Sequence, residues 1–401
     1  MLIILTTHPI QYQVPLWQAL ARDGRVPFEV WYLTDHGVQV SLDNEFGKAF
    51  SWDLDTLEGY PYRFLKMATG ATPVSFWRCR AVEPLTDLLR ASEAAALWVQ
   101  GWQVAGYWQG VWAAKQVGIE VWLRGESNDL APPPFWRQSL KRLLLGQFFQ
   151  RVDRFLCIGQ ANRRLYEKFG VSSSKLHSAP YAVDNERLSR QAERIRLRRA
   201  ELRKQWKIAE DSFCILYCGK FIPVKRPLDV IAATRQMKKY TQATKPHLLF
   251  VGSGELGDQL RSECSVVFDA ENASPSQSVV ADDWQRPLAS FAGFLNQTEI
   301  SQAYVAADCL VLPGRETWGL VVNEALASGL PCVVSDACGC ADDLIRPVAP
   351  QLCFRIGDDA QLAKALAAVA ERESVMTDLR QFSQTHNFTQ TVQTIADIYP
   401  G

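Results

Sequence analysis

The sequence predicts an α/β protein of two domains, each built around a parallel sheet. Short apolar runs alternate with amphipathic stretches along the whole chain, which is the pattern of buried parallel strands joined by helices. The chain has 401 residues, which is long for one hydrophobic core and suits two domains of about 150–200 residues each. The clearest unit lies at residues 309–335, where an apolar run, a glycine-containing turn, a helical pattern and a second apolar run follow one another.

The first half of the chain supplies the elements of an N-terminal domain, residues 1–185. The predicted strands are residues 2–5, 28–33, 96–99, 119–123 and 155–158, and the helical patterns between them include 14–22, 82–92, 104–117 and 135–150. Prolines 132–134 precede the last of these helices and punctuate its start.

A second series of elements predicts a C-terminal domain, residues 186–385. Its strands are residues 213–218, 247–251, 291–294, 309–312, 332–335 and 352–354, with helices at 228–239 and 256–264. The domain boundary is therefore expected between residues 183 and 211. A final helical pattern, 389–399, has too little apolar surface to stand alone.

Two segments interrupt this rhythm. Residues 186–207 carry nine Lys or Arg and three Glu, which we interpret as a solvated, salt-bridged helix, with a surface for anionic lipid as the alternative. Residues 265–288 are rich in Asn, Ser, Pro and Asp, and we interpret them as a long surface loop, ordered or disordered.

Composition excludes several classes of protein. Lys and Arg number 43, as do Asp and Glu, so no net charge favours nucleic acid. The ten cysteines show no paired C-x-x-C spacing, and we interpret Cys338 and Cys340 as reduced residues rather than zinc ligands. The apolar N-terminal run is too short for a signal peptide or a membrane helix. We expect a cytoplasmic protein, at most attached to the inner face of a membrane.

The stretch that follows the strand at 309–312 predicts a phosphate site. Glu316 lies in the predicted turn and Glu324 about one turn inside the helix, while Gly319 allows a ligand to approach the backbone. The first N–H groups of a helix have no intrahelical partner and favour an anion.

Two further turns follow predicted strand ends, where ligands bind in open parallel sheets. Gly219, Lys220 and Lys225 follow the strand at 213–218, and fixed cations there can stabilise a diphosphate leaving group in place of a metal. The second turn, Gly252-Ser253-Gly254, follows the strand at 247–251. Alone it is a weak phosphate-loop signal.

Together these strings closely resemble the signature of the retaining nucleotide-sugar glycosyltransferases of family 4 (group 1), which have the GT-B fold. The resemblance is most specific at residues 293–345, good at 216–256 and loose at 1–180. It implies two Rossmann-like domains that face a cleft, an acceptor-binding first domain and a donor-binding second domain. It also implies that the last helix, within residues 386–401, crosses back to the N-terminal domain.

The resemblance also implies roles for single residues. Lys220 and Lys225 would stabilise the diphosphate without a metal, although Arg is common at the first position; Glu316 would contact the donor sugar and Glu324 the ribose hydroxyls. The remaining donor-binding residues implied by the resemblance are Gly219, Gly252, Ser253, Gly254, Thr317, Trp318, Gly319 and Leu320.

The first domain departs from the family pattern at two loops. The loop after residues 2–5 lacks the glycine pair of many relatives, and it offers His8 and Gln11 for phosphate or acceptor, with a structural role for His8 as the alternative. After residues 119–123, where relatives often place a histidine, Arg124 and Glu126 would supply the polar contacts, unless they form a structural ion pair. Ten of the thirteen tryptophans precede residue 137, which fits stacking on an acceptor sugar or packing in the core.

We therefore expect a retaining transferase that moves a hexose from a nucleotide diphosphate sugar to a saccharide or lipid-linked acceptor. It would need no metal or other cofactor, and we interpret Asp53-Leu54-Asp55 as unrelated to metal binding. The alternatives are a nucleotide-sugar epimerase of the same fold and an inactive sugar or nucleotide binder. The sequence does not distinguish UDP, GDP and ADP, nor does it define the oligomeric state.

Overall fold

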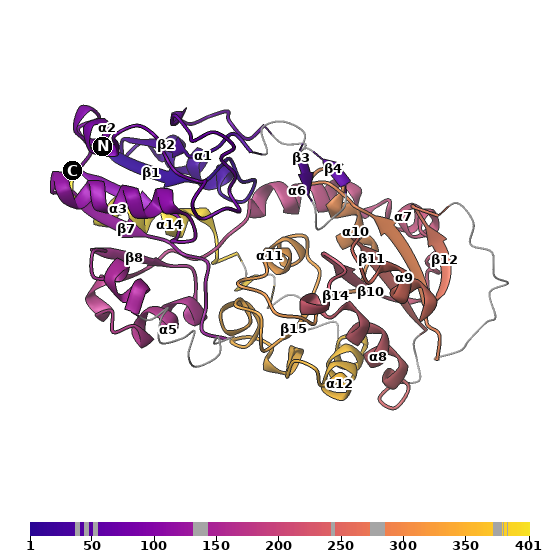
Figure 1. Ribbon diagram of the computed structural model, residues 1–401. Helices are drawn as coiled ribbons and strands as arrows, with labels where there is room; N and C mark the ends of the chain where they lie inside the picture. Colours follow the sequence, from indigo (N-terminus) through magenta and orange to yellow (C-terminus); the bar gives the residue numbers. More distant parts are fainter. Residues whose placement is uncertain are drawn as a thin grey trace. The chain divides into compact units, whose positions relative to one another are not determined.

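The computed structural model describes residues 1–36, 41–43, 48–50, 55–130, 143–241, 245–272, 285–371, 379, 381–382 and 384–401 (Figure 1). The chain divides into two compact units. Unit 1 comprises Met1–Ser41, Phe50–Val183 and Asn387–Gly401, and unit 2 comprises Leu42–Ala49 and Asp184–His386. Each unit contains a sheet of seven strands that are all parallel, as the alternation of apolar runs and helices predicts.

The sheet of unit 1 has the strand order β5-β2-β1-β6-β7-β8-β9. The strands are β1 Leu2–Thr6, β2 Phe28–Tyr32, β5 Tyr62–Phe64, β6 Ala96–Val99, β7 Glu120–Leu123, β8 Arg154–Cys157 and β9 Leu176–Ser178. Its helices are α1 Val14–Asp23, α2 Leu85–Ala91, α3 Ala105–Val117, α5 Gln160–Lys168 and α14 Phe388–Ile398, and residues 143–149 are also helical.

Successive residues of these strands enter two different cores, because side chains alternate across a sheet. Ile3 and Leu5 pack with α2, α3 and the helix at 143–149. Leu2 and Ile4 pack on the other face with α1 and α14. Both faces of the sheet are therefore covered.

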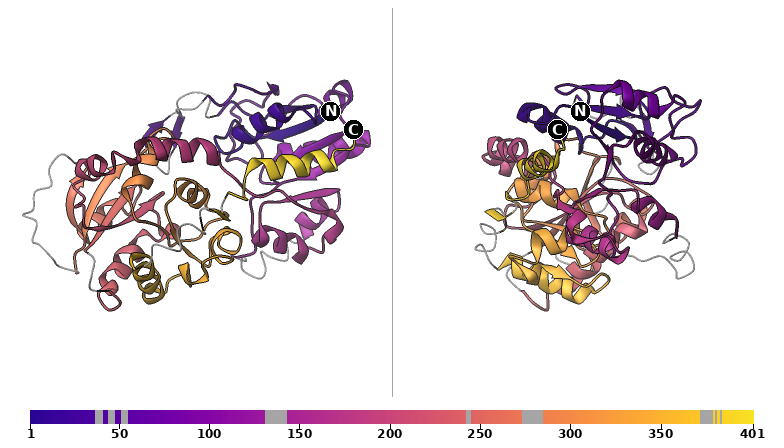
Figure 2. Two further views of the ribbon diagram at one scale, coloured as in Figure 1. Left: turned by 180° about the vertical axis from the view of Figure 1, so that it is seen from behind. Right: turned by 90° about the vertical axis from the view of Figure 1, so that its left-hand side faces the viewer.

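The last helix belongs to unit 1, as the predicted crossing back implies (Figure 2). Two threonine hydroxyls of α14 donate to the end of β9 and the segment after it: Thr394 to the carbonyl of Ser178 at 2.8 Å and Thr391 to that of Pro180 at 3.2 Å. Val392 and Ile395 enter the core beside α1. The packing supplies the apolar partner that this helix lacks by itself.

The sheet of unit 2 has the strand order β12-β13-β11-β10-β14-β15-β16. The strands are β10 Phe213–Cys218, β11 Pro246–Val251, β12 Ser265–Asp269, β13 Leu288–Gly293, β14 Cys309–Leu312, β15 Cys332–Ser335 and β16 Cys353–Phe354. The helices are α6 Asn185–Arg196, α7 Arg199–Gln205, α8 Pro227–Met237, α9 Gly257–Ser262, α10 Ile300–Ala306, α11 Leu320–Ala327 and α12 Asp359–Ala370. Two short strands, β3 Ser41–Asp43 and β4 Lys48–Phe50, form a separate sheet.

Three expectations about single segments are wrong. The loop predicted at 265–288 begins with the edge strand β12, which pairs with β13; residues 273–284 lie outside the described chain. The helix predicted from residue 82 begins at Leu85, because Pro84 is its N-cap and the backbone of Val82 bonds to Lys66. Residues 186–207 form two helices rather than one, and Arg203 of the second is 1% exposed instead of solvated.

No helix among the described residues combines the length and the apolar character that a membrane span requires.

Candidate active site

The donor motifs of unit 2 follow the carboxyl ends of three neighbouring strands. β11, β10 and β14 are adjacent in the sheet and parallel, so the loops that follow them emerge at one edge. This is the edge at which open parallel sheets bind ligands. The loops contain Gly219–Lys225, Gly252–Gly254 and Gly314–Gly319.

The first two loops are joined by their backbones. Phe221 N donates to the Ser253 carbonyl at 2.8 Å, and Leu256 N donates to the Phe221 carbonyl at 2.9 Å. Gly252 has a φ of +130° and packs against the carbonyl of Gly219, so a side chain at this position would collide with backbone. The glycines of this turn therefore allow close contact between two loops, a role that the sequence did not reveal.

Lys225 and Glu316 form an ion pair between the first loop and the third. Both side chains are mostly shielded, with 24% and 18% of their surfaces exposed. The backbones meet beside them, because Arg315 N donates to the Val224 carbonyl at 3.0 Å. The two motifs that sequence analysis assigned to one donor site are therefore in contact.

Lys220 lies two residues after β10, in the loop that carries Lys225. The Tyr217 hydroxyl donates to the Lys220 carbonyl at 2.8 Å and fixes the backbone at this point. The structure thus places both predicted lysines in one loop, with Lys225 in direct contact with Glu316.

Gly319 is the N-cap of α11, with a φ of +104° that favours glycine. No side chain caps this end of the helix. The loop before it is fixed by Trp318, whose indole Nε1 donates to Asn323 Oδ1 at 2.7 Å and whose carbonyl accepts from Cys340 N at 3.0 Å. Thr317 is exposed and Leu320 is half-buried, so the two predicted positions that flank Trp318 and Gly319 remain accessible.

Glu324 is buried, with 5% of its surface exposed, which excludes an ordinary surface acid. The Tyr304 hydroxyl donates to its Oε2 at 2.6 Å and Gln297 Nε2 donates to its Oε1 at 3.3 Å. Arg187 in turn donates to Gln297 Oε1 at 2.8 Å. Burial raises the pKa of Glu324, and the hydrogen bonds from Tyr304 and Gln297 oppose that rise. A carboxylate accepts up to about four hydrogen bonds, so each oxygen can take a further donor.

In unit 1 the polar residues again follow neighbouring strands. Gln11 lies in the loop after β1 and Gln100 directly after β6, and both are buried. Neither Gln11 Oε1 nor Gln100 Nε2 has a hydrogen-bond partner among the residues that the structure describes. Buried polar atoms without partners are rare in folded proteins and mark positions where a ligand can bind.

His8 shares the loop of Gln11. Its Nδ1 and the Thr7 hydroxyl are 2.9 Å apart, and its ring packs edge-on against His36 with centroids 5.3 Å apart. Burial, with a smaller contribution from His36, lowers the pKa of His8 to about 4. His8 is therefore neutral at physiological pH.

Arg124 and Glu126 are linked through Tyr181. The Arg124 guanidinium lies over the Tyr181 ring, 4.7 Å from its centroid, and the Tyr181 hydroxyl donates to Glu126 Oε1 at 2.6 Å. No ion pair joins Arg124 to Glu126 in the part of the chain that the structure describes. Arg124 is 5% exposed, its Nε has no partner, and burial lowers its pKa. Arg124 and Glu126 therefore do not form the structural ion pair that was the alternative considered from the sequence.

Four residues near these sites were not predicted: Gln100, Tyr181, Gln297 and Tyr304. Gln100 and Gln297 follow strands β6 and β13, so the strand-end argument applied to every strand would have found them. Tyr181 lies three residues after β9, an edge strand that the sequence did not predict. Tyr304 lies in the middle of α10, where nothing in the sequence distinguishes it.

The predictions about metals concern residues of both units. Among the described residues no group of three or more His, Cys, Asp or Glu side chains could hold a metal ion. Asp53 lies outside the described residues, and Asp55 Oδ1 accepts from Leu57 N at 2.9 Å. Cys338 and Cys340 are buried free thiols.

Comparisons with known proteins agree with this geometry. Residues 212–372 match the family described as "Glycosyl transferases group 1". The chain is 25% identical over 241 residues to D-inositol 3-phosphate glycosyltransferase from Nocardia farcinica, covering 60% of this chain and 49% of that one. It is 39% identical over 101 residues to GDP-mannose-dependent alpha-mannosyltransferase from Mycobacterium tuberculosis, covering 22% and 26%. The chain therefore aligns with about half the length of the first relative and about a quarter of the second.

Solved structures resemble almost the whole chain. HepE from Anabaena, solved with UDP and glucose, aligns with a TM-score of 0.64 at 16% identity, over 99% of this chain and 98% of that one. Sucrose-phosphate synthase from Thermosynechococcus elongatus aligns with a TM-score of 0.64 at 15% identity, over 99% and 98%. At these identities the likeness shows the fold alone. The two units therefore have the architecture of the GT-B fold, and residues 212–372 of unit 2 match the model of the group 1 glycosyl transferases.

Proposed function

We propose that this protein is a glycosyltransferase that moves a hexose from a nucleotide diphosphate sugar to a hydroxyl of a saccharide or lipid-linked acceptor. The observation that carries the proposal is the contact between Lys225 and Glu316, which joins a cation for the diphosphate to an acid for the sugar. The relatives whose names include a nucleotide or sugar donor support this choice of substrate class.

Unit 2 would bind the donor. Lys220 and Lys225 would lie against the diphosphate, whose oxygens gain charge as the bond to the sugar breaks. The uncapped N-terminus of α11, at Gly319 and Leu320, would add backbone donors. Glu324 would accept hydrogen bonds from the ribose, and Glu316 from hydroxyls of the sugar.

The reaction would retain the anomeric configuration and need no metal. The bond between the anomeric carbon and the diphosphate oxygen breaks, and a bond forms from that carbon to the acceptor oxygen on the same face. The acceptor proton moves to an oxygen of the leaving diphosphate. The positive charges of the two lysines would then stabilise the leaving diphosphate, as a divalent cation does in metal-dependent transfer.

Unit 1 would bind the acceptor. The unpartnered atoms of Gln11, Gln100 and Arg124 are suited to hydroxyl or phosphate oxygens, and Glu126 would accept from an acceptor hydroxyl. His8 would contribute a neutral hydrogen bond rather than a charge, because its pKa is lowered.

Single and double substitution of the ion pair tests the proposal. We expect Lys225→Ala and Glu316→Ala each to lower kcat for transfer about 10²–10³-fold, as the loss of one preorganised charge does elsewhere. The double variant should lose less than the product of the two, because the residues are in contact. Arg198→Ala, an exposed arginine paired with Glu201, is the matched control and should retain full activity. Unchanged product formation in both single variants would show that the assignment is wrong.

The products distinguish transfer from the alternatives. Incubation of the enzyme with nucleotide sugar alone should yield no epimer, and the linkage formed with acceptor should have the donor's anomeric configuration by NMR. Transfer should continue in the presence of a chelator. Interconversion of the sugar without acceptor would establish an epimerase, and donor binding without transfer to a broad acceptor panel would establish an inactive binder.

Nucleotide binding tests the ribose assignment separately. We expect Glu324→Gln to weaken binding of the preferred nucleoside diphosphate about 10- to 100-fold, because hydrogen bonds to a charged acceptor contribute about 1.5–3 kcal/mol. Calorimetry with UDP, GDP and ADP would identify the preferred nucleotide in the same experiment. An affinity equal to that of the wild type would place the ribose elsewhere.

A further inference from the structure

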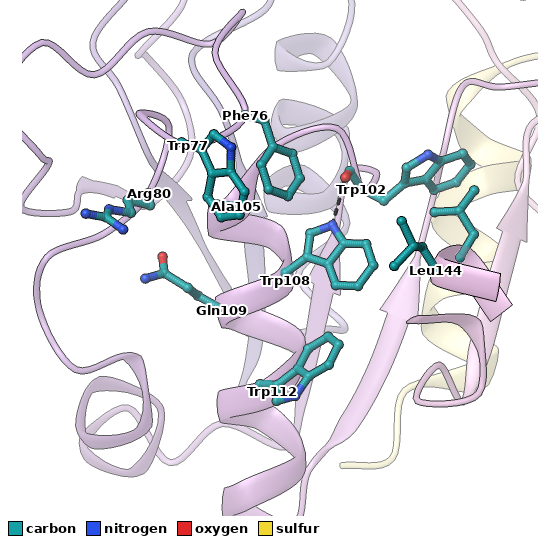
Figure 3. A pocket seen from close by; sticks show the side chains of 10 residues that line it. Phe76, Trp77, Arg80, Trp102, Ala105, Trp108, Gln109, Trp112 and Leu144 are labelled. Atoms are coloured by element: carbon teal, nitrogen blue, oxygen red, sulfur yellow. Dashed lines mark hydrogen bonds between the residues drawn. The ribbon is translucent and has the colours of Figure 1, made fainter. Parts of the chain in front are cut away.

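A pocket of about 980 Å³ opens on the outer side of α3 in unit 1 (Figure 3). Its volume is at the upper end of the range of about 300–1,000 Å³ for small-molecule sites. Aromatic and aliphatic side chains line it: Phe76 and Trp77, Trp102, Trp108 and Trp112 of α3, and Leu144 and Leu145 of the helix at 143–149. None of these residues belongs to the candidate active site.

The walls of the pocket are fixed by contacts within unit 1. Ala105 N donates to the Phe76 carbonyl at 2.8 Å and Gly106 N to the Cys79 carbonyl at 2.9 Å, which attaches the segment at 76–80 to the first turn of α3. Trp108 Nε1 donates to the Trp102 carbonyl at 2.9 Å. The pocket is therefore formed before any ligand binds.

The lining favours hydrocarbon over sugar. Among the described lining residues, Arg80 and Gln109 are the polar side chains besides the indoles, and the Nε1 of Trp108 is already bonded. A saccharide in a site of this size would leave most of its hydroxyls without partners, which costs binding energy. Trp77 is 73% exposed and Leu144 52%, so burial of these surfaces by an apolar ligand is favourable.

One end of the pocket adjoins the candidate acceptor residues. The ring of Trp102 packs so closely on Gly125 that a Cβ there would lie 2.5 Å from Cζ3. Gly125 stands between Arg124 and Glu126. The exposed Arg80 follows Cys79 and lines the opposite side of the pocket from Trp102, on the side of Gln109 (Figure 3); it forms no ion pair among the described residues. An anionic group would complement the pocket on the side of Arg80.

Trp112 lines the far end, two helical turns or about 10 Å from Ala105. The Arg151 guanidinium covers its ring, 4.5 Å from the centroid. Apolar side chains therefore line the pocket along two turns of α3, a length that an extended hydrocarbon chain can follow.

We propose that this pocket holds the hydrocarbon chain of a lipid-linked acceptor, with a phosphate or carboxylate of that lipid beside Arg80. The identification of the lipid as the acceptor rests on the proposed function; the binding of an anionic amphiphile in the pocket does not. The contact between Trp102 and Gly125 connects the pocket to the segment that contains Arg124 and Glu126.

Decyl phosphate, used below its micelle concentration, is the probe. It should change the tryptophan fluorescence of the wild type saturably, and decanol should bind more weakly. Ala105→Phe, which fills the pocket, should weaken decyl phosphate binding about tenfold or more, because several methylenes lose their contacts. Trp77→Ala and Trp112→Ala, at exposed positions, should weaken it in the same direction, whereas the exposed Tyr240→Ala of unit 2 should not. Arg80→Gln should weaken binding of decyl phosphate and leave binding of decanol unchanged.

Several results would overturn the proposal: no saturable change in the wild type, equal affinity in all pocket variants, a larger response to maltose than to decyl phosphate, or binding to anionic vesicles without binding to free decyl phosphate.

The transfer reaction distinguishes the two proposals. Pocket variants should raise KM for a lipid-linked acceptor and leave transfer to a soluble acceptor unchanged. Amphiphile binding by a protein with no transferase activity would refute the function alone, and activity without amphiphile binding would refute the pocket alone.

Discussion

His8 shows how burial sets the chemistry of a single side chain. The ring lies against His36 and beside the Thr7 hydroxyl, and its pKa falls from 6.5 to about 4. Burial disfavours the charged imidazolium more than His36 does. The side chain can donate or accept one hydrogen bond toward a ligand, but it does not bring a positive charge to the loop after β1.

The lowered pKa predicts a stability that depends on pH. As the pH falls below 6.5 the unfolded chain takes up a proton on His8 before the folded chain does, so stability is complete above 6.5 and declines toward pH 4. The decline attributable to His8 amounts to at most about 3 kcal/mol. We expect His8→Asn to flatten this part of the profile in urea denaturation between pH 7 and 4. His36→Asn, which leaves the burial in place, should change it less; an identical profile for wild type and His8→Asn would contradict the lowered pKa.

Gly314 lies where the third donor loop of unit 2 crosses Lys225. A Cβ at this position would lie 2.5 Å from the carbonyl carbon and oxygen of Lys225, which are backbone atoms and cannot turn aside. We expect Gly314→Ala to destabilise the protein by about 1–3 kcal/mol, as overpacking does, and to weaken nucleotide binding by displacing Lys225.

A second glycine in unit 1 is the control for Gly314→Ala. Gly146 lies in the helix at 143–149, and a Cβ there would meet no atom of the described residues within 4 Å. Gly146→Ala should therefore stabilise the protein by about 0.5–1 kcal/mol through its effect on helix propensity. Thermal unfolding and calorimetry would compare the two variants, and a Gly314→Ala protein as stable as the wild type would show that the two loops separate easily.

At the scale of the elements, α7 is held to its sheet by a buried arginine. Arg203 donates to Asp308 Oδ2 at 2.6 Å and to the carbonyls of Ala306 and Ser212 at 2.9 and 3.0 Å. Asp308 also accepts from Cys214 N at 2.7 Å and so joins α7 to the start of β10. The basic segment at residues 186–207 therefore supplies a buried arginine that attaches α7 to the sheet of unit 2.

Substitution of Arg203 should destabilise the protein far more than substitution of the nearby Arg198. We expect Arg203→Met to lower the free energy of unfolding by about 3–5 kcal/mol, because several carbonyls would lose a buried donor and Asp308 would keep only one of its two arginines, Arg199. Arg198→Ala removes an exposed pair with Glu201 from the start of the same helix and should cost at most about 1 kcal/mol. Chemical denaturation measures both, and equal losses would contradict the role given to Arg203.

Most central strands could be predicted from the sequence, whereas three of the four edge strands could not; the fourth, β16, lies within the strand predicted at 352–354. β6, β10, β14 and β15 have the predicted bounds because they are buried on both faces and read as continuous apolar runs. β5, β9 and β12 lie at sheet edges, where strands are short and partly exposed and carry no such run. β12 is also followed by a polar stretch, so the sequence of the whole segment resembles that of a loop. Its Asp269 forms an ion pair with Arg261 at 2.7 Å.

At the scale of the whole molecule, the sequence predicted which loops carry the candidate site but not how the side chains within it are connected. Strand ends and residue types located Lys225, Glu316 and Glu324. The hydrogen bonds from Tyr304 and Gln297 to Glu324 join α10 and the loop after β13 to α11, and no spacing in the sequence relates these segments. The pair formed by Lys225 and Glu316 depends likewise on β10 and β14 being neighbours in the sheet.

The division into two units with separate cores predicts where a nucleotide acts. The donor motifs all lie in unit 2, so a nucleoside diphosphate at ten times its dissociation constant should stabilise the folded protein by about 1.4 kcal/mol and slow hydrogen exchange first in the loops of that unit. The affected amides should be those of residues 219–225, 252–256 and 314–324. Hydrogen exchange with mass spectrometry, with and without UDP, GDP or ADP, measures this directly. Lys225→Ala should reduce the protection, and Arg203→Met measured below its own unfolding midpoint should retain it, because Arg203 contacts the amino ends of β10 and β14 whereas the loops follow their carboxyl ends. Protection confined to unit 1, or absent with all three nucleotides, would contradict the assignment of the donor site.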